Sequence, residues 1–215
     1  MNRLSVAIDG PAGVGKSTIA KIIADKLDLM YINTGAMYRA VTLKALEKDI
    51  DYKSVDKLLE LTNSMDIYFE NDELFLNGEN INDQITMPEI SKRVSEYASV
   101  REVRVKLVEL MRAMSNKYNV IMDGRDIGTV VLKDAPYKFF LVASANERAD
   151  RRYKELVGKG LEVDYNEILE DIIKRDEYDS TREVDPLRKA DDAIEVDTTY
   201  LNIEEVVSEI LKHIK

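Results

Sequence analysis

Leu4-Ser5-Val6-Ala7-Ile8-Asp9-Gly10-Pro11-Ala12-Gly13-Val14-Gly15-Lys16-Ser17 is the stretch that decides the fold of this 215-residue chain. Its first five residues form a mostly apolar run that predicts a short buried strand, which glycine and proline end at once. From Lys16 onward the apolar residues follow helical spacing, at Ile19, Ile22, Ile23 and Leu27. Residues 10–17 match the pattern G-x-x-x-x-G-K-[ST] in full, and they lie between a predicted strand and a predicted helix.

A loop of this pattern binds phosphate through its backbone. Glycines allow successive N–H groups to point inward, and the helix N-terminus adds unpaired N–H groups and a positive dipole end. Lys16 would reach the β- and γ-phosphates of a nucleotide, and the Ser17 hydroxyl would bind Mg²⁺ directly. The alternative is a glycine-rich turn that only joins strand to helix. The residues that we expect to bind the nucleotide here are Gly10, Pro11, Ala12, Gly13, Val14, Gly15, Lys16, Ser17 and Thr18.

A second acid-bearing position follows another apolar run. Val120-Ile121-Met122 predicts a buried strand that ends in Asp123. An acid at the end of such a strand can hold a water molecule of a magnesium shell. We therefore expect Asp123 to bind Mg²⁺ through water, the alternative being an aspartate that caps the next turn.

The rest of the chain alternates strands with helices, which predicts a parallel sheet covered on both faces. Three helix starts carry a cap residue followed three positions later by glutamate, namely Ser144, Asp164 and Asn202. The five expected strands are 4–8, 30–32, 120–122, 139–142 and 193–196, and a second helix is expected over 36–47. The predicted fold class is α/β, a P-loop NTPase fold with a central parallel five-stranded sheet flanked by helices, in a single domain 1–215.

One region breaks this alternation and predicts an insertion of about 36–117. Residues 65–69 and 73–76 are short segments joined by Asn71-Asp72 and followed by Asn77-Gly78, which are turn dipeptides. They predict a small antiparallel meander. Two helices are expected after it, one starting near Thr86 and one over 101–115.

Composition excludes several classes of protein. The chain has 31 basic and 41 acidic side chains, a formal net charge of −10, which disfavours binding to a phosphate backbone. It has no cysteine, and its one histidine, His213, lies near the end, so thiol catalysis and histidine-based sites are excluded. No apolar run approaches the roughly 18 residues that span a bilayer, and the N-terminus does not match a signal peptide. We expect a cytoplasmic monomer that binds neither nucleic acid nor membrane.

Arginine placement favours a kinase over a GTPase. The chain contains no D-x-x-G, and Asn116-Lys117-Tyr118-Asn119 departs from the N-K-x-D base reader. Arg148, Arg151 and Arg152 are expected on one helix face, and Arg175, Asp179 and Arg182 on another, so that both sets could clamp phosphates. Ion pairing at the surface is the alternative for any one of them.

The acceptor stays open on these residues alone. A hydroxyl acceptor needs a general base, whereas the phosphate of a nucleoside monophosphate is already anionic. The lack of an available histidine fits the second case, although an aspartate can also serve as a base. A nucleotide-binding regulator without activity is a further alternative.

Three motifs give the chain a family resemblance. Residues 9–18, then Thr34-Gly35-Ala36-Met37-Tyr38-Arg39, then Asp123-Gly124-Arg125-Asp126-Ile127-Gly128-Thr129-Val130-Val131 resemble the bacterial cytidylate kinases in order and spacing. The resemblance implies transfer of the γ-phosphoryl group of ATP to CMP or dCMP with Mg²⁺. It also implies that the insertion binds the monophosphate and that a short lid spans about 148–185. The family pattern leads us to expect Ser where this chain has Thr34, which keeps the hydroxyl.

The resemblance also implies roles for individual residues. Arg39 and Arg125 would bind the acceptor phosphate, Asp179 the sugar hydroxyls, and Ser95, Arg104 and Asp126 the cytosine. An aspartate such as Asp126 can accept from the amino group of cytosine but would face a lone pair of uracil, the alternative being an ion pair with Arg125. The implied catalytic residues are Lys16, Arg125, Arg175 and Arg182, and the implied additional ATP ligands are Arg148 and Arg152. The implied acceptor-binding residues are Thr34, Tyr38, Arg39, Ser95, Arg104, Asp123, Arg125, Asp126, Asp179 and Arg182.

Overall fold

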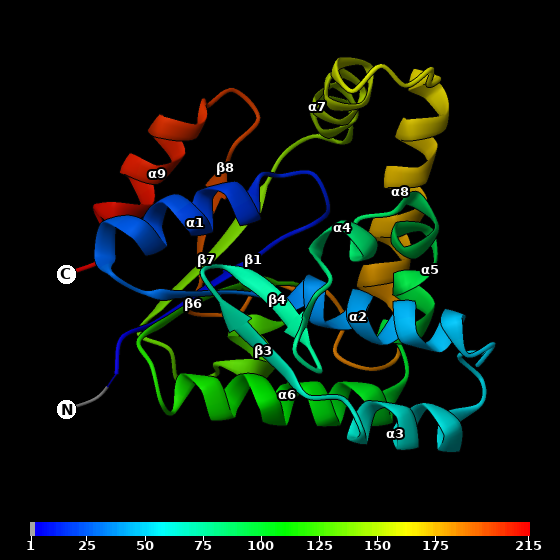
Figure 1. Ribbon diagram of the computed structural model, residues 1–215. Helices are drawn as coiled ribbons and strands as arrows, with labels where there is room; N and C mark the ends of the chain where they lie inside the picture. Colours follow the sequence, from blue (N-terminus) through cyan, green and yellow to red (C-terminus); the bar gives the residue numbers. More distant parts are fainter. Residues whose placement is uncertain (1–2) are drawn as a thin grey trace.

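A five-stranded parallel sheet forms the centre of the computed structural model, which describes residues 3–215 (Figure 1). The strand order is β2-β6-β1-β7-β8, and every pair in it is parallel. The strands are β1 (Ser5–Asp9), β2 (Met30–Asn33), β6 (Val120–Gly124), β7 (Tyr137–Val142) and β8 (Ile194–Asp197). This confirms the predicted α/β class and the five strands, whose bounds differ from the expected ones by one or two residues.

Helices cover both faces of the sheet because alternate strand residues point to opposite sides. Val6 and Ile8 of β1 pack in one apolar core with α1 (Lys16–Leu27) and α9 (Ile203–Leu211). Ala7, between them, belongs to a second core. Figure 1 shows α1 and α9 on one side of the sheet and α6 (Arg101–Ser115) on the other. Because these strands are parallel, the carboxyl ends of β1, β2 and β6 lie at the same edge of the sheet.

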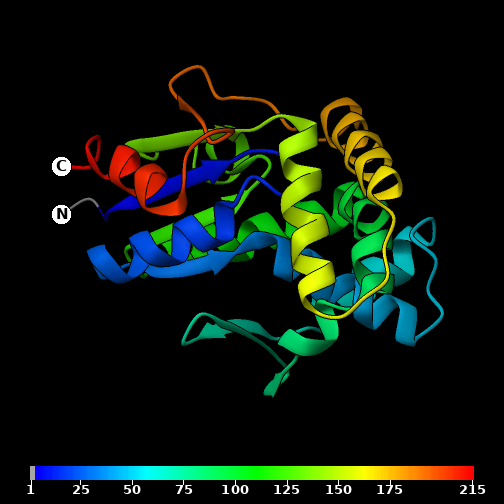
Figure 2. The same cartoon turned by 90° about the horizontal axis from the view of Figure 1, so that it is seen from above.

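The predicted insertion contains the expected antiparallel meander, and the structure adds elements that the sequence pattern did not predict. Asn71 and Asp72 have φ of 50° and 63°, and Asn77 and Gly78 have φ of 51° and 85°, as tight hairpin turns require. The second of these turns leads to β5, which was not expected. Figure 2 shows β3 and β4 projecting from the body of the molecule. The elements are α2 (Thr34–Glu47), α3 (Val55–Asn63), β3 (Ile67–Glu70), β4 (Glu73–Leu76), β5 (Glu79–Asn80), α4 (Asn82–Ile85), α5 (Pro88–Ala98) and α6. The boundaries of the insertion stay a prediction.

Two packed helices, α7 (Ala145–Gly158) and α8 (Tyr165–Thr181), form an arm beside the P-loop edge (Figure 2). Their predicted caps are present, since Ser144 accepts from the Glu147 N–H and Asp164 from the Glu167 N–H. Asn202 likewise forms a capping box at the start of α9. Within residues 3–215, no helix combines the length and the apolar character that crossing a membrane requires.

One helical prediction is wrong. Arg182 does not share a helix face with Arg175, because α8 ends at Thr181 and Arg182 has extended torsions of φ −57° and ψ 145°. Asp185 then takes a φ of 47° and precedes Pro186, whose ring disfavours helical torsions in the residue before it. The position of Arg182 is therefore set by the extended segment that follows α8, and not by the spacing of residues along the helix.

Candidate active site

Two pockets meet at the phosphate loop. The first, of about 180 Å³, lies among α2, α5, α6, the end of β6 and α8. The second, of about 960 Å³, lies among the loop, α7 and residues 198–206. Gly13, Lys16 and Ser17 line both. Every residue that the sequence assigns to catalysis or to acceptor binding lines the first pocket.

The phosphate loop has the backbone that its pattern predicts. Gly10 has a φ of 148°, and a Cβ there would lie 2.3 Å from the Leu141 carbonyl oxygen of β7, so only glycine fits. Lys16 starts α1, and its buried ammonium donates to the Pro11 carbonyl at 2.6 Å. Burial and the neighbouring Arg125 hold the pKa of Lys16 well below its usual value, while the nearby aspartates act in the other direction. The loop thus carries a buried cation whose hydrogen-bond partner in this structure is a neutral carbonyl.

Ser17 and Asp123 form the oxygen cluster that a hard divalent cation prefers. The Ser17 hydroxyl donates to Asp123 Oδ2 at 2.9 Å, and the Tyr31 hydroxyl donates to Oδ1 at 2.7 Å. Residues 3–215 hold no group of three or more His, Cys, Asp or Glu side chains that could bind a metal by themselves. A hydroxyl and one carboxylate, completed by phosphate and water oxygens, are typical of Mg²⁺ sites. The donor set therefore fits Mg²⁺.

The middle of the first pocket gathers arginines that lack partners. The Nε atoms of Arg39 and Arg175 are buried and have no hydrogen-bond partner. Burial, together with the positive charge of Arg125, lowers the pKa of Arg39 and lowers that of Arg175 to about 10. Buried donors without partners and mutually repelling cations are unfavourable unless an anion completes them. The arrangement is a binding site for an anion.

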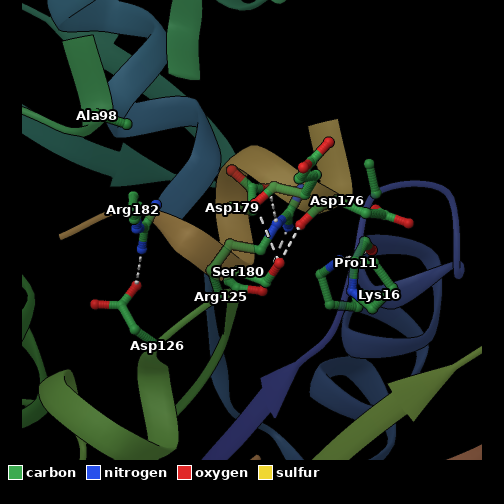
Figure 3. Close-up of polar contacts among 12 residues, drawn as sticks. Pro11, Lys16, Ala98, Arg125, Asp126, Asp176, Asp179, Ser180 and Arg182 are labelled. Carbon is green, nitrogen blue, oxygen red and sulfur yellow. Dashed lines mark hydrogen bonds and ion pairs between the residues drawn. The ribbon is translucent and has the colours of Figure 1, made fainter. Parts of the chain in front are cut away.

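Each remaining charge in this pocket is paired across elements (Figure 3). Arg125, after β6, donates through Nε to Asp179 of α8 at 2.8 Å. Burial alone would raise the pKa of Asp179, but the charge of Arg125 and its hydrogen bond lower it by more, so the pKa lies below its usual value. Arg182 lies 3.5 Å from Asp126, toward which it points. The alternative expected for Asp126 was a pair with Arg125, and the structure pairs it with Arg182 and Arg104 instead.

Arg104 and Asp126 lie at the end of the pocket beside α5. Arg104 is 1% exposed, donates through Nη2 to Asp126 and through Nη1 to the Ala98 carbonyl at 3.0 Å, and lies over the Tyr38 ring. Ser95 of α5 lines the same pocket. Asp126 starts a π-helix, η1 (Ile127–Val131), that was not predicted, and such turns are frequent at functional sites. A base-sized ligand would here face both a carboxylate and guanidinium donors.

The sequence led us to expect that the three arginines of α7 point at one common place, but each has a different partner. Arg148 is buried and donates to Asp176 of α8 at 3.0 Å and to the Ala12 carbonyl of the loop at 3.1 Å, so it lines neither pocket. Arg151 donates to the Thr198 carbonyl at 2.6 Å. Arg152 lines the second pocket and pairs with Glu155 at 2.8 Å. The structure uses Arg148 to join the loop to the arm, and the expected contact of Arg148 and Arg152 with ATP stays a prediction.

Two acidic residues that contact the site were not singled out as site residues from the sequence. Asp9, at the end of β1, accepts from the Ile127 and Gly128 N–H groups at 2.8 and 2.7 Å and so holds the turn after Asp126. Its strand-end position matches that of Asp123, which was a usable signal. Asp185 accepts from Arg104 Nε at 2.8 Å, and no motif pointed to it.

Comparison with known proteins decides the family. The family model described as cytidylate kinase matches residues 6–215. The chain belongs to the cytidylate kinase family. A protein of Clostridium perfringens named cytidylate kinase is 71% identical over the full length of both chains. Another of that name, from Clostridium acetobutylicum, is 58% identical over 99% of this chain and 98% of its own.

Membership confirms the resemblance that the three motifs indicated, and with it the kinase class. Solved structures agree on the fold alone. A gluconokinase from Sinorhizobium meliloti has a TM-score of 0.50 at 14% identity, covering 99% of this chain and 91% of that one. A sugar kinase from Janibacter has a TM-score of 0.51 at 16% identity, covering 98% and 93%.

Proposed function

We propose that this member of the cytidylate kinase family transfers the γ-phosphoryl group of ATP to CMP and dCMP, giving CDP and dCDP, with Mg²⁺. One observation carries the proposal. The first pocket joins, in one continuous lining, a phosphate loop, buried arginines without partners and a carboxylate–guanidinium pair suited to a base. The second pocket, on the other side of Lys16, leaves room for the donor nucleotide.

The anionic ends of the two nucleotides would meet among the cations. Arg39 and Arg175 gain hydrogen-bond partners when phosphate oxygens reach their Nε atoms. Lys16 exchanges the Pro11 carbonyl for a charged phosphate oxygen. These groups neutralise charge on the transferring group and align acceptor with donor, so catalysis comes from positioning and electrostatics without a covalent enzyme intermediate.

Ser17 and Asp123 would hold Mg²⁺, with Ser17 as a direct ligand and Asp123 through water. The ion supplies charge neutralisation at the phosphates when bound. Tyr31 keeps the Asp123 carboxylate oriented through its hydroxyl. Thr34 donates to the Asp123 backbone carbonyl at 2.7 Å and fixes the start of α2 beside the strand end.

Cytosine recognition would come from Asp126, Arg104 and Ser95. Asp126 accepts from the amino group of cytosine, and Arg104 and Ser95 donate to the ring acceptors. Uracil presents an oxygen where cytosine presents the amino group, which leaves Asp126 facing a lone pair. Asp179, which accepts from Arg125 Nε, would also accept from the sugar hydroxyls. A monomeric state and a cytoplasmic location stay predictions from the sequence.

A panel of acceptors tests the proposal. ADP release with ATP and Mg²⁺ is measured for CMP, dCMP, UMP, AMP, dTMP and shikimate, and CMP and dCMP should exceed UMP by about 100-fold in kcat/KM. Asp126→Asn should reduce this preference by about tenfold or more, because its amide can donate to uracil. Asp134→Asn, an exposed acid just after η1, serves as the control.

Three results would contradict the proposal. Equal rates with all monophosphates would show that the base is not read at this site. Turnover of shikimate alone would point to a hydroxyl-directed kinase. ATP binding without turnover of any acceptor would indicate a nucleotide-binding regulator.

A further inference from the structure

The guanidinium of Arg104 is held by three different parts of the chain. Its Nη1 bonds the Ala98 carbonyl at the end of α5, its Nη2 bonds Asp126 after β6, and its Nε bonds Asp185 after α8. A guanidinium has five N–H groups, so one N–H on each terminal nitrogen remains for a ligand. The direction of those two N–H groups depends on the rotation of the guanidinium plane, and the Nε bond fixes that rotation.

Asp185 is itself held in an unusual conformation. Its φ of 47° lies in the left-handed region, which residues other than glycine adopt rarely. Its backbone carbonyl accepts from Arg182 Nε at 2.9 Å, while its carboxylate accepts from Arg104. One residue thus joins both arginines that contact Asp126, one through its side chain and one through its backbone.

The charges in this cluster balance. Arg104 and Arg182 face Asp126 and Asp185, and the Arg104, Arg182 and Asp126 side chains are 2–6% exposed. Without the Asp185 carboxylate, both arginines would draw on Asp126 alone. Asp126 would then have less capacity to accept a hydrogen bond from a ligand, and Arg104 would be free to turn.

We propose that Asp185 is a positioning residue for base recognition, which fixes the Arg104 guanidinium at the acceptor base and couples that recognition to the end of α8. The inference rests on the base-reading role proposed above for Arg104 and Asp126. The same helix α8 carries Arg175 and Asp179, both in the first pocket. A base that is correctly paired with Arg104 and Asp126 would therefore stabilise the segment 182–185, which follows the helix that carries Arg175.

A matched pair of substitutions separates the side chain from the backbone. Glycine and asparagine both accept a φ near 47°, so neither introduces the strain that alanine would. Asp185→Gly removes the acceptor for Arg104 Nε, whereas Asp185→Asn keeps one acceptor oxygen and loses the charge. Glu195→Gln, which breaks the exposed Lys189–Glu195 pair of the same C-terminal region, is the control.

Asp185→Gly should raise the Kd of CMP about tenfold and lower the CMP-to-UMP ratio of kcat/KM by a similar factor, because a hydrogen bond to a charged group is lost. Its KM for ATP should stay within about twofold of wild type, since Arg104 lies away from the second pocket. Asp185→Asn should recover most of the CMP affinity. Equal losses for ATP and CMP, or a melting temperature that falls while selectivity is unchanged, would assign Asp185 a structural role and overturn the inference.

A second background tests whether Asp185 acts through Arg104. Arg104→Lys keeps the positive charge but lacks the Nε–H group, so Asp185→Gly should cause no further loss of CMP affinity in it. Additive losses in the double variant would overturn the inference. If Asp126→Asn and Arg104→Lys leave the CMP-to-UMP ratio unchanged in active enzyme, the proposed base-reading role fails and this inference fails with it. If they change the ratio and Asp185→Gly does not, only the present inference fails.

Discussion

The two pockets beside the phosphate loop are built from different kinds of charge pair. In the first pocket, pairs join distant segments, such as Arg104 with Asp126 and Arg125 with Asp179, and their side chains are at most 19% exposed. In the second pocket, Arg152 pairs with Glu155 within one helix, and both side chains are about 45% exposed. The first pocket is charged and interlocked before any ligand binds, whereas the second is open.

This difference predicts unequal selectivity for the two nucleotides. Buried pairs cost desolvation and are costly to break singly, because the remaining partner stays buried without compensation. They therefore reject an acceptor whose hydrogen-bonding pattern is wrong. Exposed pairs contribute about 0–1 kcal/mol each and can rearrange. We infer that the acceptor base is recognised strictly, while the donor is held mainly by its phosphates.

Lys16 lines both pockets, so its removal should have the largest effect of all. Lys16→Ala should lower kcat by about 1,000-fold or more. Lys16 is the cation of the loop that we expect to contact the transferred phosphoryl group, and alanine cannot replace its charge. The melting temperature of the variant should not fall, since the substitution removes a buried ammonium bonded to a neutral carbonyl. Lys26→Ala, an exposed position of the same helix, is the control for kinetics by ADP release and for thermal melting. Near-normal turnover would contradict the role of the loop.

Arg175 should show that the first pocket trades stability for binding. Arg175→Met should lower kcat/KM for CMP by about 100-fold through loss of a phosphate contact. It should also raise the free energy of unfolding of the ligand-free protein by about 1 kcal/mol, since a buried cation near Arg39 and Arg125 disappears. ADP release at varied CMP concentration measures the first effect and urea unfolding the second, and inorganic phosphate should stabilise wild type more than the variant. A variant that is both less stable and fully active would mean that Arg175 is a structural residue.

The parts of this arrangement that the sequence predicted are those coded by short segments. The phosphate loop, the five strands, the Asn71-Asp72 turn and the helix caps each depend on residues within a few positions, and each is present. The three family motifs contain part of the first pocket's lining, including Lys16, Arg39 and Asp126. Five further lining residues lie outside the motifs and were expected from the family resemblance, namely Ser95, Arg104, Arg175, Asp179 and Arg182.

What the sequence did not predict depends on contacts between distant segments or on single torsions. The Arg104–Asp185 pair joins residues 81 positions apart, and no local pattern connects them. Arg148 has the spacing of a phosphate ligand but pairs with Asp176, because the packing of α7 on α8 decides its partner. α8 ends at Thr181 because Arg182 takes extended torsions, and the i, i+4 and i+7 spacing of Arg175, Asp179 and Arg182 carried no signal of that single change in torsion.

Asp9 lines neither pocket, but it holds the turn that follows Asp126 of the first pocket, and its carboxyl is expected to give the protein's stability a pH dependence. Burial raises the pKa of its carboxyl to about 7, against the lowering effect of the Gly128 and Ile127 N–H groups, with Asp126 raising it and Lys16 lowering it. The folded state then holds the proton more tightly than the unfolded chain, so the group adds stability at acid pH. That contribution is complete below pH of about 4 and is lost as pH rises to about 7.

We expect the free energy of unfolding of wild type, taken relative to that of Asp9→Asn, to fall between pH 5 and 7 by on the order of 1 kcal/mol for each pH unit. Urea unfolding at several pH values measures it, and the carbon-13 shift of the Asp9 carboxyl gives the titration directly. A carboxyl that titrates near pH 4 in the folded protein would show that the two N–H donors outweigh burial.

Arg152 should give the smallest effect and the sharpest test of the open second pocket. Because its side chain is 44% exposed and paired within α7, Arg152→Ala should change the KM for ATP by about threefold or less. The matched change in the first pocket, Arg39→Ala, removes a buried donor that lacks a partner and should cost about 100-fold in kcat/KM for CMP. If Arg152→Ala instead lowers kcat as much as Arg39→Ala, the arm must bring Arg152 onto the transferring phosphate during turnover. The open arrangement of the second pocket would then describe only the ligand-free protein, and the donor would be held as tightly as the acceptor.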